Sequence, residues 1–562
     1  MKIKLILILF VLTNFNLLAQ CPTVNLTLTT QTSVNNFVSN YPNCTNLNVD
    51  LTITGSNITN LAGLSSLISI NGDLVVASCP NLTDISGLNN ITTISGYLKI
   101  VNNDLLTTLP SFQNLTSLNN LMIRTCDVLN TINSFNNLNS INRIEINSNT
   151  NLTTLSGFSN LLSVNELDIN SQSLTNIQGL SNLTTIGDIS LRNTQLSNLN
   201  NLGNVQTINS LSISFNNQFL SFEGLNPLIT INSIFLNNNP LFNNFLNLSN
   251  LTNLINLNVS NCNSVTNFNG LNLTSLNNLI LVNNPQLNSL SAFSTITTLN
   301  GGLYVNNCSN LQNLIGLQNL VSCGSLNLSF NNALTNLNGL NNLVVANGIL
   351  EIYNNNNLEN LIGLESLVSI GCSLRIYNNP ILSNLNALIN IQNIYIFGQE
   401  ICDLGGTVFI DNNPLLTSLQ GLNNINFTNI YNLTITNCSQ LSICSVASVC
   451  NYLSNGGLNT ISANSTNCNS SSQILNNCSL SDSEIEKYNL IIHPNPTNSF
   501  IDISAITENC GSFKGDVFDN LGKQLKTNII NSKIDFSIFQ NGIYYIKFEC
   551  ENEIITRKII KQ

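Results

Sequence analysis

The feature that most constrains this chain is an internal repeat. A segment like Leu361-Ile362-Gly363-Leu364 recurs at steps of 22 to 24 residues, with one longer step of 34 residues. Its last residue is Leu64, Leu88, Phe112, Phe135, Phe158, Leu180, Leu202, Leu225, Leu248, Leu271, Phe293, Leu317, Leu340, Leu364, Leu388 and Leu422. One unit of this size cannot bury its apolar side alone, so the units must stack into a solenoid. The long step includes residues 397–406, where we expect an inserted loop or hairpin.

Each unit changes its apolar period partway through. Leu361, Leu364 and Leu367 are three residues apart, which is typical of a tight or short helical side. Leu374 and Ile376 then alternate with polar residues, as in a strand, and a turn-forming Asn-Asn-Pro follows. We therefore predict a mainly β, parallel solenoid with one strand per unit. The 17 expected strand centres are Ile53, Val76, Ile100, Ile123, Ile146, Ile169, Leu191, Ile213, Leu236, Val259, Leu281, Val305, Leu328, Ile352, Ile376, Ile410 and Ile435.

The position three residues after each centre forms the most informative column, with Asn or Cys in 14 of 17 places. A buried Asn can pair with the backbone of its own rung and of the next, and losing such a partner costs about 1–3 kcal/mol. Cys fits because it is small and tolerates burial. The column includes Asn103, Asn149, Asn216, Asn239, Asn284, Asn331, Asn355, Asn379 and Asn413. It also holds Cys79, Cys126, Cys262, Cys308 and Cys438, with Ser56, Gln172 and Thr194 as exceptions.

With this column, the repeat resembles the leucine-rich repeat, Leu-x-x-Leu-x-Leu-x-x-Asn/Cys-x-Leu, over residues 51 to about 444. The irregular step and the Gly of the motif are more similar to the receptor L-domain variety. Gly or a polar residue often replaces the first Leu, which leaves the subclass open. We place the leucine-rich-like repeats at residues 51–440.

The chain begins with the pattern of a secretory signal peptide, residues 1–20. Lys2 and Lys4 precede an apolar run at residues 5–12, and Ala19-Gln20 follows. This run is too short for a membrane span, and no other stretch is long and apolar enough. A lipoprotein cleavage box at Cys21 is the less favoured alternative, because Gln20 is not small. We expect an exported protein without a membrane span.

Sixteen Cys in an exported chain indicate a disulfide framework. Solenoid ends need caps, because the last rung would otherwise expose the core. We predict that Cys21 and Cys44 close an N-terminal cap at residues 21–50 with a disulfide. The five Cys of the column are expected to be free and buried.

A C-terminal cap and linker is expected at residues 441–480, with a short helix near residues 444–453. Its cysteines are Cys444, Cys450, Cys468 and Cys478. Their pairing is open, and a four-Cys zinc site is the disfavoured alternative. Cys510 and Cys550 are a possible pair in the tail, and Cys323, Cys372 and Cys402 are unassigned.

Composition changes sharply near residue 482. Residues 21–481 hold 16 acidic and 5 basic groups, whereas residues 482–562 hold 11 and 9. Such a shift marks a domain boundary, and the Ser-rich residues 469–483 are predicted to be a linker. Residues 485–562 alternate over short segments with Gly turns, which predicts a small antiparallel β-sandwich.

The tail also carries a series of motifs: Pro494, Asn495 and Pro496, then Gly522 and Lys523, then Gly542 and Tyr544. Their order and spacing resemble the C-terminal sorting domain of type IX secretion in Gram-negative bacteria. The resemblance implies that the outer-membrane machinery reads this domain, and that the protein is secreted or held on the outer cell surface. One departure is His493, where the family usually has an aromatic residue.

Composition excludes several functions. The net charge is −11, and scattered Lys and Arg do not follow a phosphate backbone, so no nucleic-acid partner is expected. A single His argues against His-ligated metals, and we expect no cofactor. Glu166 and Asp168 would lie side by side on one strand, whereas glycosidases need carboxylates facing across a cleft. We predict no enzyme; a polysaccharide lyase is the disfavoured alternative.

Outward strand positions become aromatic and charged toward the C-terminal rungs. Exposed Tyr beside Arg is typical of binding hot spots, and aromatic rows also stack sugars, although aromatic residues also simply pair across strands. The candidate binding face is Tyr304, Glu351, Tyr353, Arg375, Tyr377, Phe409 and Asp411. A weaker candidate is a mixed charge stripe of Lys99, Arg124, Arg143, Glu145, Asp168 and Arg192. We expect a repeat protein that binds a protein or glycan partner, with a structural spacer as the alternative.

Overall fold

The structure is a computed structural model that describes residues 21–395, 406–485, 497–503, 513–519, 522–526, 529–530, 533–550 and 553–561. Several expected features lie outside these residues: the signal peptide, most of the insertion at residues 397–406, His493, Pro494, Asn495, Pro496, Cys402 and Cys510. The chain forms two compact units, Met1–Asn469 and Ser470–Gln562, and each is described by itself.

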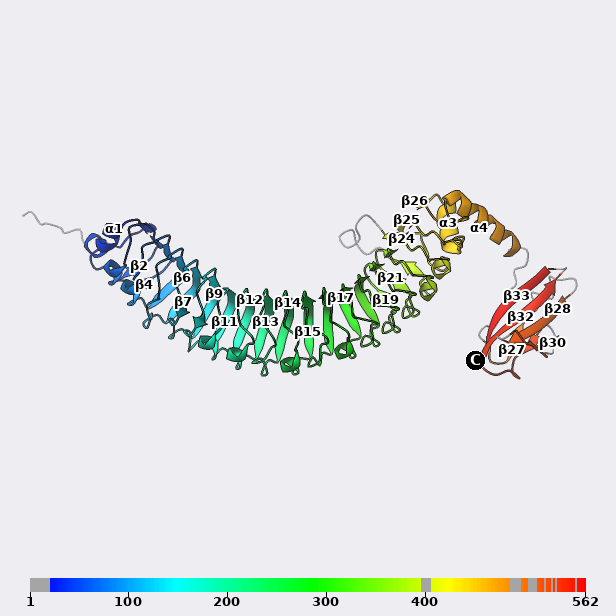
Figure 1. Ribbon diagram of the computed structural model, residues 1–562, viewed down its shortest axis with the longest axis horizontal. Helices are drawn as coiled ribbons and strands as arrows, with labels where there is room; N and C mark the ends of the chain where they lie inside the picture. The colour runs from blue at the N-terminus through cyan, green and yellow to red at the C-terminus, as the bar shows by residue number, and fades with distance from the viewer. Residues whose placement is uncertain are drawn as a thin grey trace, which may run out of the picture. The chain divides into compact units, whose positions relative to one another are not determined.

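One parallel sheet runs through the first unit, with one strand from each rung (Figure 1). Most neighbouring strands keep a constant register, such as Leu167 opposite Ile189 and Ile189 opposite Leu211. In the described strands the register shifts locally at three places, after Ile94, Leu299 and Gly406. The expected parallel solenoid is confirmed. Within the described residues the 19 rung strands are β1 (Leu26–Leu28), β3 (Leu51–Ile53), β5 (Leu74–Ala77), β6 (Thr93–Val101), β7 (Ser117–Arg124), β9 (Ser140–Asn147), β11 (Ser163–Asn170), β12 (Thr185–Arg192), β13 (Thr207–Ser214), β14 (Thr230–Asn237), β15 (Asn253–Ser260), β16 (Ser275–Val282), β17 (Thr298–Asn306), β18 (Ser322–Ser329), β20 (Leu350–Tyr353), β22 (Leu374–Tyr377), β24 (Gly406–Asp411), β25 (Ile430–Thr436) and β26 (Asn459–Ser462).

The expected count of 17 rungs is two too low, because the strands at both ends lack the repeat motif. β1 pairs with β3, with Leu28 opposite Ile53. β26 pairs with β25, with Ile461 opposite Ile435. β26 follows helix α3 (Ala447–Ser454), which replaces the side with the three-residue period. The N-terminal end also carries the short helices α1 (Gln31–Asn35) and α2 (Phe37–Asn40).

Shorter elements complete the rungs. Strands β2 (Asn46–Leu47), β4 (Ser69–Ile70), β19 (Val345–Ala346), β21 (Ser369–Ile370) and β23 (Asn393–Ile394) extend the main sheet, and β8 (Thr131–Ile132) pairs with β10 (Thr154–Leu155) separately. The leucine segments form turns or 3-10 helices, whose three residues per turn explain the three-residue spacing. The 3-10 helices are η1 (Ala62–Leu64), η2 (Ser86–Leu88), η3 (Gln178–Leu180), η4 (Asn200–Leu202), η5 (Leu246–Leu248), η6 (Ser291–Phe293), η7 (Asn386–Leu388) and η8 (Gln420–Leu422).

Glycine in the motif has a physical reason at Gly363. Its φ is +116°, and a Cβ atom there would lie 2.1 Å from the carbonyl oxygen of Leu337 in the preceding rung. A larger residue would therefore both strain the backbone and push the rungs apart.

The Asn column forms a hydrogen-bonded ladder, illustrated by the fully buried Asn355. Its Oδ1 accepts a hydrogen bond of 3.0 Å from the backbone N–H of Asn331. Its Nδ2 donates to the carbonyl oxygens of Leu328 at 3.0 Å and Tyr353 at 3.1 Å. Its bonds to the backbone outside its own rung therefore reach the preceding rung, not the next one as expected. Toward the next rung, its Nδ2 instead donates to the side-chain Oδ1 of Asn379 at 3.3 Å.

The second unit contains two small antiparallel sheets. Their apolar faces share a core of Ile501, Ile503, Val517, Ile534, Phe536, Ile546 and Ile559. One sheet has the order β27-β31-β30 and the other β29-β28-β32-β33. The strands are β27 (Phe500–Asp502), β28 (Phe513–Asp519), β29 (Gln524–Leu525), β30 (Ile529–Ile530), β31 (Lys533–Asp535), β32 (Gly542–Cys550) and β33 (Glu553–Lys561).

The Ser-rich residues 469–483 were expected to be a linker, but most of them form helix α4 (Ser471–Ile485). Ser470 explains where the helix begins, because its hydroxyl oxygen accepts a 3.3 Å hydrogen bond from the N–H of Gln473. No helix in the described part of the chain is long and apolar enough to cross a membrane.

We predict that Asn355→Ala lowers the free energy of unfolding of the repeat unit by roughly 2–4 kcal/mol. The change leaves the N–H of Asn331 and the carbonyl of Leu328 without their partner in a buried site. Urea unfolding followed by circular dichroism measures the effect. Asn357→Ala is the matched control, because its exposed amide donates to the carbonyl of Asn332 at 2.8 Å. Equal losses in both variants would refute the structural role of the ladder.

Candidate functional site

Four aromatic side chains on neighbouring rungs form a continuous line, which we call the aromatic row: Phe330, Tyr353, Tyr377 and Phe409. Phe330 follows β18, and the others lie on β20, β22 and β24. The ring centroids are 5.6 Å apart for Phe330 and Tyr353, 4.6 Å for the two Tyr, and 5.5 Å for Tyr377 and Phe409. The Tyr rings are stacked within 9° of parallel, because register places Tyr353 directly opposite Tyr377.

Charged side chains border the aromatic row. Arg375 Nη1 lies 3.8 Å from Glu351 Oε1, and the Tyr377 hydroxyl donates to the same oxygen at 3.3 Å. Burial and the negative charge of Glu351 raise the pKa of the Tyr377 phenol, so it remains a hydrogen-bond donor. Asp411 Oδ1 accepts a 2.6 Å hydrogen bond from the hydroxyl of Thr436. A depression of 540 Å³ opens beside these groups.

The structure brings together six of the seven residues of the expected binding face, and Tyr304 is the exception. Tyr304 lies on β17 opposite Asn327, which lies opposite Glu351. Asn327 therefore separates Tyr304 from the others, and its Nδ2 donates to Glu351 Oε2 at 2.7 Å.

Phe330 belongs to the aromatic row although the sequence pattern did not single it out. It lies two residues after the strand centre Leu328, where the chain turns with positive φ. Its φ is 58°, and Phe215 has 59° at the same position of another rung, whereas most rungs carry Asn, such as Asn354 at 55°. A bulky residue in this conformation is strained by about 1–3 kcal/mol. Aligning this column across the repeats would have shown Phe330 as an exception.

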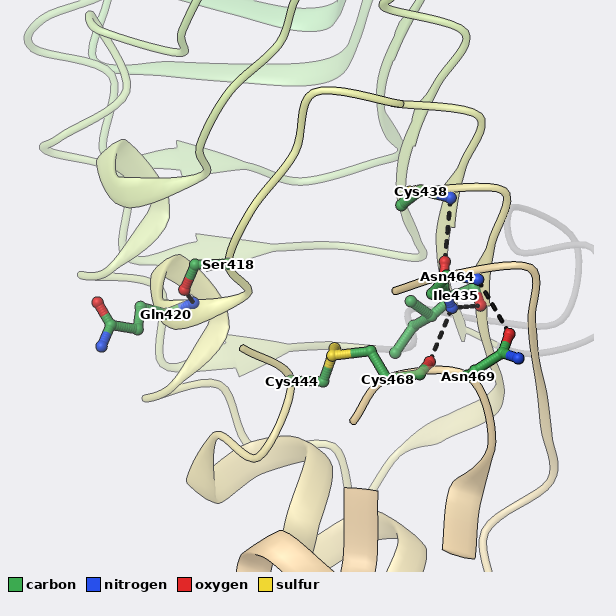
Figure 2. The surroundings of a disulfide bond; sticks show 8 residues. All are labelled: Ser418, Gln420, Ile435, Cys438, Cys444, Asn464, Cys468 and Asn469. Carbon is green, nitrogen blue, oxygen red and sulfur yellow. Dashed lines mark hydrogen bonds between the residues drawn. A yellow bond between two sulfur atoms is a disulfide. The ribbon is translucent and has the colours of Figure 1, made fainter. Parts of the chain in front are cut away.

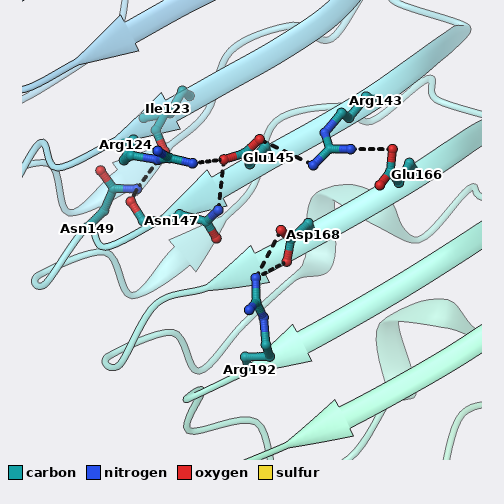
Figure 3. A network of polar contacts seen from close by, with 9 residues as sticks. All are labelled: Ile123, Arg124, Arg143, Glu145, Asn147, Asn149, Glu166, Asp168 and Arg192. Atoms are coloured by element: carbon teal, nitrogen blue, oxygen red, sulfur yellow. Dashed lines mark hydrogen bonds and ion pairs between the residues drawn. The ribbon is translucent and has the colours of Figure 1, made fainter. Parts of the chain in front are cut away.

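The second candidate, the charge stripe, is largely self-paired (Figure 3). Arg143 Nη1 lies 2.5 Å from Glu166 Oε2, and Arg143 and Arg124 both contact Glu145. Arg192 Nη2 lies 2.9 Å from Asp168 Oδ1. Lys99 is apart from these groups and instead pairs with Asp73 at 2.8 Å. Side chains that neutralise one another in this way offer little net charge to a ligand.

Glu145 is the buried centre of the charge stripe, and its side chain is only 5% exposed. Burial alone would raise its pKa, but hydrogen bonds from Arg124 and Asn147 and the charges of Arg124 and Arg143 lower it below its ordinary value. The ionised form is thus favoured by folding and stabilises the fold above the unfolded-state pKa. This contribution is lost as the pH falls through the folded-state pKa.

Disulfides and an additional ladder residue close the ends of the solenoid. Cys21 bonds to Cys44, and Cys444 bonds to Cys468 beside the last rung (Figure 2). Cys372, Cys450 and Cys478 are also disulfide-bonded. Asn464 continues the Asn ladder by one position, because its Oδ1 accepts from the N–H of Cys438 at 3.0 Å and its Nδ2 donates to the carbonyl of Ile435 at 2.8 Å (Figure 2).

The free thiols that the structure describes are buried and form no reactive or metal-binding site. Burial raises the pKa of the Cys126 thiol to about 11 and that of Cys308 to about 12. Such thiols stay protonated and unreactive at neutral pH. The free and buried cysteines are Cys79, Cys126, Cys262, Cys308, Cys323 and Cys438. Among the residues that the structure describes, no group of three or more His, Cys, Asp or Glu side chains could hold a metal ion.

The motif residues of the tail that the structure describes lie in a turn, at the start of a strand and against the core. Gly522 turns the chain between β28 and β29 with φ of 79°, and the N–H of Lys523 donates to Asp519 Oδ1 at 2.9 Å. Gly542 begins β32 opposite Lys561. The ring of Tyr544 packs against the core, and its hydroxyl donates to the carbonyl of Gln540 at 2.7 Å.

We predict that Glu145→Gln lowers the free energy of unfolding near pH 7 by about 1–3 kcal/mol, because two Arg side chains lose their buried counter-charge. The deficit should shrink as the pH falls below the ordinary Glu pKa of about 4.3 and through the lower folded-state pKa, since protonation removes the charge of wild-type Glu145. Urea unfolding at several pH values measures this. Glu166→Gln is the control: its side chain is 45% exposed, so a loss below about 1 kcal/mol is expected. A pH-independent deficit would contradict the assignment.

Comparisons with known proteins identify the tail. No curated protein matches the chain. A leucine-rich repeat protein from Bacteroides ovatus is 12% identical over 56% of this chain and 83% of that protein, with a TM-score of 0.25, from which nothing is concluded. Residues 491–562 match the family described as the secretion system C-terminal sorting domain. The parallel solenoid is therefore followed by a type IX secretion sorting domain, and the protein is secreted or attached to the outer surface of a Gram-negative bacterium.

Proposed function

We propose that this secreted or surface-displayed solenoid binds a partner protein through the aromatic row. The observation that carries the proposal is the row itself, four aromatic side chains in contact across four rungs. Tyr and Arg are among the residues that dominate binding energy at protein interfaces, and Arg375 lies directly beside Tyr353 and Tyr377.

Ring orientation favours a protein partner over a sugar. Sugars pack against the faces of aromatic rings, but Tyr353 and Tyr377 are stacked 9° from parallel and cover one face of each other. Phe330 and Phe409 meet them at 78° and 82°. Most of the outward surface is therefore ring edge, which suits apolar and hydrogen-bonding side chains.

The strain at Phe330 supports a function for the aromatic row. Asn at this position would adopt the same backbone conformation at lower cost, as it does in most other rungs. Phe330 is nonetheless 45% exposed, so burial of its ring in this unit offsets only part of the strain. An interface that covers the ring would supply the missing stabilisation.

The scaffold also suits recognition. β18, β20, β22 and β24 pair in a constant register, so the aromatic row is held rigid before a partner arrives. A pre-organised surface loses less conformational entropy on binding.

We predict that peptides selected from a phage-displayed library on the immobilised full chain bind through the aromatic row. Tyr353→Ala/Tyr377→Ala should weaken their binding tenfold or more, about 1.4 kcal/mol. Phe330→Asn should weaken binding similarly while raising the midpoint of thermal unfolding, because strain is relieved. Fluorescence polarisation and thermal unfolding are the measurements.

Phe215→Asn is the matched control, because Phe215 has the same positive φ and lies outside the aromatic row. It should raise the unfolding midpoint without changing binding. Selected peptides that bind all variants equally would place the interface elsewhere. If no peptide is enriched, binding to a glycan array that is lost in Phe330→Asn would indicate a glycan partner, and no binding to either would favour the structural spacer.

A further inference from the structure

A pocket of 730 Å³ lies at the C-terminal end of the repeat unit, away from the residues of the aromatic row. One wall is the turn at residues 423–428, and the other is α3 with the turn that follows it. Small-molecule sites typically measure about 300–1,000 Å³. The pocket is therefore large enough for a ligand of one to three sugar rings.

The lining of this cap pocket is polar but carries no charge. Every lining side chain is neutral, and the amides of Asn426, Asn451 and Asn455 contribute to it. Asn426 Oδ1 already accepts from the N–H of Thr428, and Asn455 Nδ2 donates to the carbonyl of Asn451. The Nδ2 of Asn426, the Oδ1 of Asn455 and the amide of Asn451 supply donors and acceptors that match neighbouring hydroxyl groups on a ligand. Asn451 and Asn455 lie four residues apart, at adjacent positions near the end of α3.

The cap pocket also has an apolar portion. Phe427 is 4% exposed, and the ring of Tyr452 meets it edge to face at 6.1 Å. Both residues line the pocket. Apolar ring surface beside amides is the combination that recognises a sugar, whose C–H groups and hydroxyls alternate around its ring.

Ser448 carries a hydroxyl that the described part of the fold leaves without a partner. Ser448 lines the pocket and is only 4% exposed. Its Oγ has no hydrogen-bond partner within the described structure. A buried hydroxyl without a partner costs about 1–3 kcal/mol. The Oγ atom itself exposes less than 1 Å², so its side chain must rotate to another rotamer to meet a ligand hydroxyl in the pocket.

The walls of the cap pocket are held in place before any ligand binds. Asn423 Oδ1 accepts a 3.0 Å hydrogen bond from the N–H of Ala447 and so ties α3 to the last leucine turn. The hydroxyl of Tyr452 donates to the carbonyl of Leu458 at 2.9 Å. The Cys444–Cys468 disulfide fixes the chain just before α3 (Figure 2).

We propose that the cap pocket is a second binding site, specific for a neutral sugar of one to three rings. A charged ligand would lose its hydration without meeting a side chain of opposite charge. A neutral polyhydroxylated ligand meets amides, the Ser448 hydroxyl and two aromatic rings. This site is independent of the partner proposed for the aromatic row.

The test uses the full chain and saturation-transfer NMR with glucose, galactose, mannose, N-acetylglucosamine and their disaccharides at about 5 mM, with glucuronate and sulfate as charged probes. At least one neutral sugar should bind with a Kd of about 0.1–10 mM. Ser448→Ala and Asn451→Ala should each weaken that binding at least fivefold.

Both variants should fold. Ser448→Ala removes a hydroxyl that has no partner, and Asn451→Ala places a better helix former in α3. Ser454→Ala makes the same substitution on α3 outside the pocket and should leave affinity unchanged. Tyr353→Ala/Tyr377→Ala should also leave it unchanged, which separates this site from the aromatic row. The proposal is overturned if no neutral sugar binds, if only glucuronate or sulfate binds, or if both pocket variants keep wild-type affinity.

Discussion

The buried side-chain amide that links each rung to the one before it is the interaction on which the rest of this structure depends. A solenoid turn leaves backbone groups in the interior, and these groups must find partners. The side chain of Asn355 takes part in four hydrogen bonds at once, two of them to the backbone of the preceding rung and one to the Asn column residue of the next. Since the bonds join equivalent positions, they hold the register as well as satisfy the backbone. Every column of core and surface residues follows from that register.

The proposed binding surface lies where the surface columns depart from the regular pattern. The regular rungs carry Asn in the left-handed position, and their outward side chains largely pair with one another. Phe330 breaks this pattern at a cost in backbone strain, and its ring meets that of Tyr353 at the end of the aromatic row. Register places Tyr353 opposite Tyr377, and Phe409 packs against Tyr377 from the next rung. The charge stripe shows the opposite case, because Glu145 and its Arg neighbours use their charges within the fold.

The ends of the stack raise a different problem, because the last rung has no neighbour to cover its core. Helix α3, strand β26 and the Cys444–Cys468 disulfide solve it at the C-terminal end. A helix laid beside a leucine turn does not match its shape as well as another rung would. The cap pocket lies at this junction, and its lining combines amides with the rings of Phe427 and Tyr452.

The sequence by itself determined the solenoid, its Asn column and the sorting domain, because a strict period and local motifs are properties of neighbouring residues. It placed Tyr353, Tyr377 and Phe409 on one face, since strand alternation decides orientation. It did not reveal β1, β26 or helix α4, whose segments lack the repeat pattern. Only the tertiary structure decided that Phe330 joins the aromatic row, that Tyr304 does not, and that residues near 425 and 450 enclose a pocket. Those contacts join residues more than twenty positions apart, and only the stacking of rungs brings such residues together.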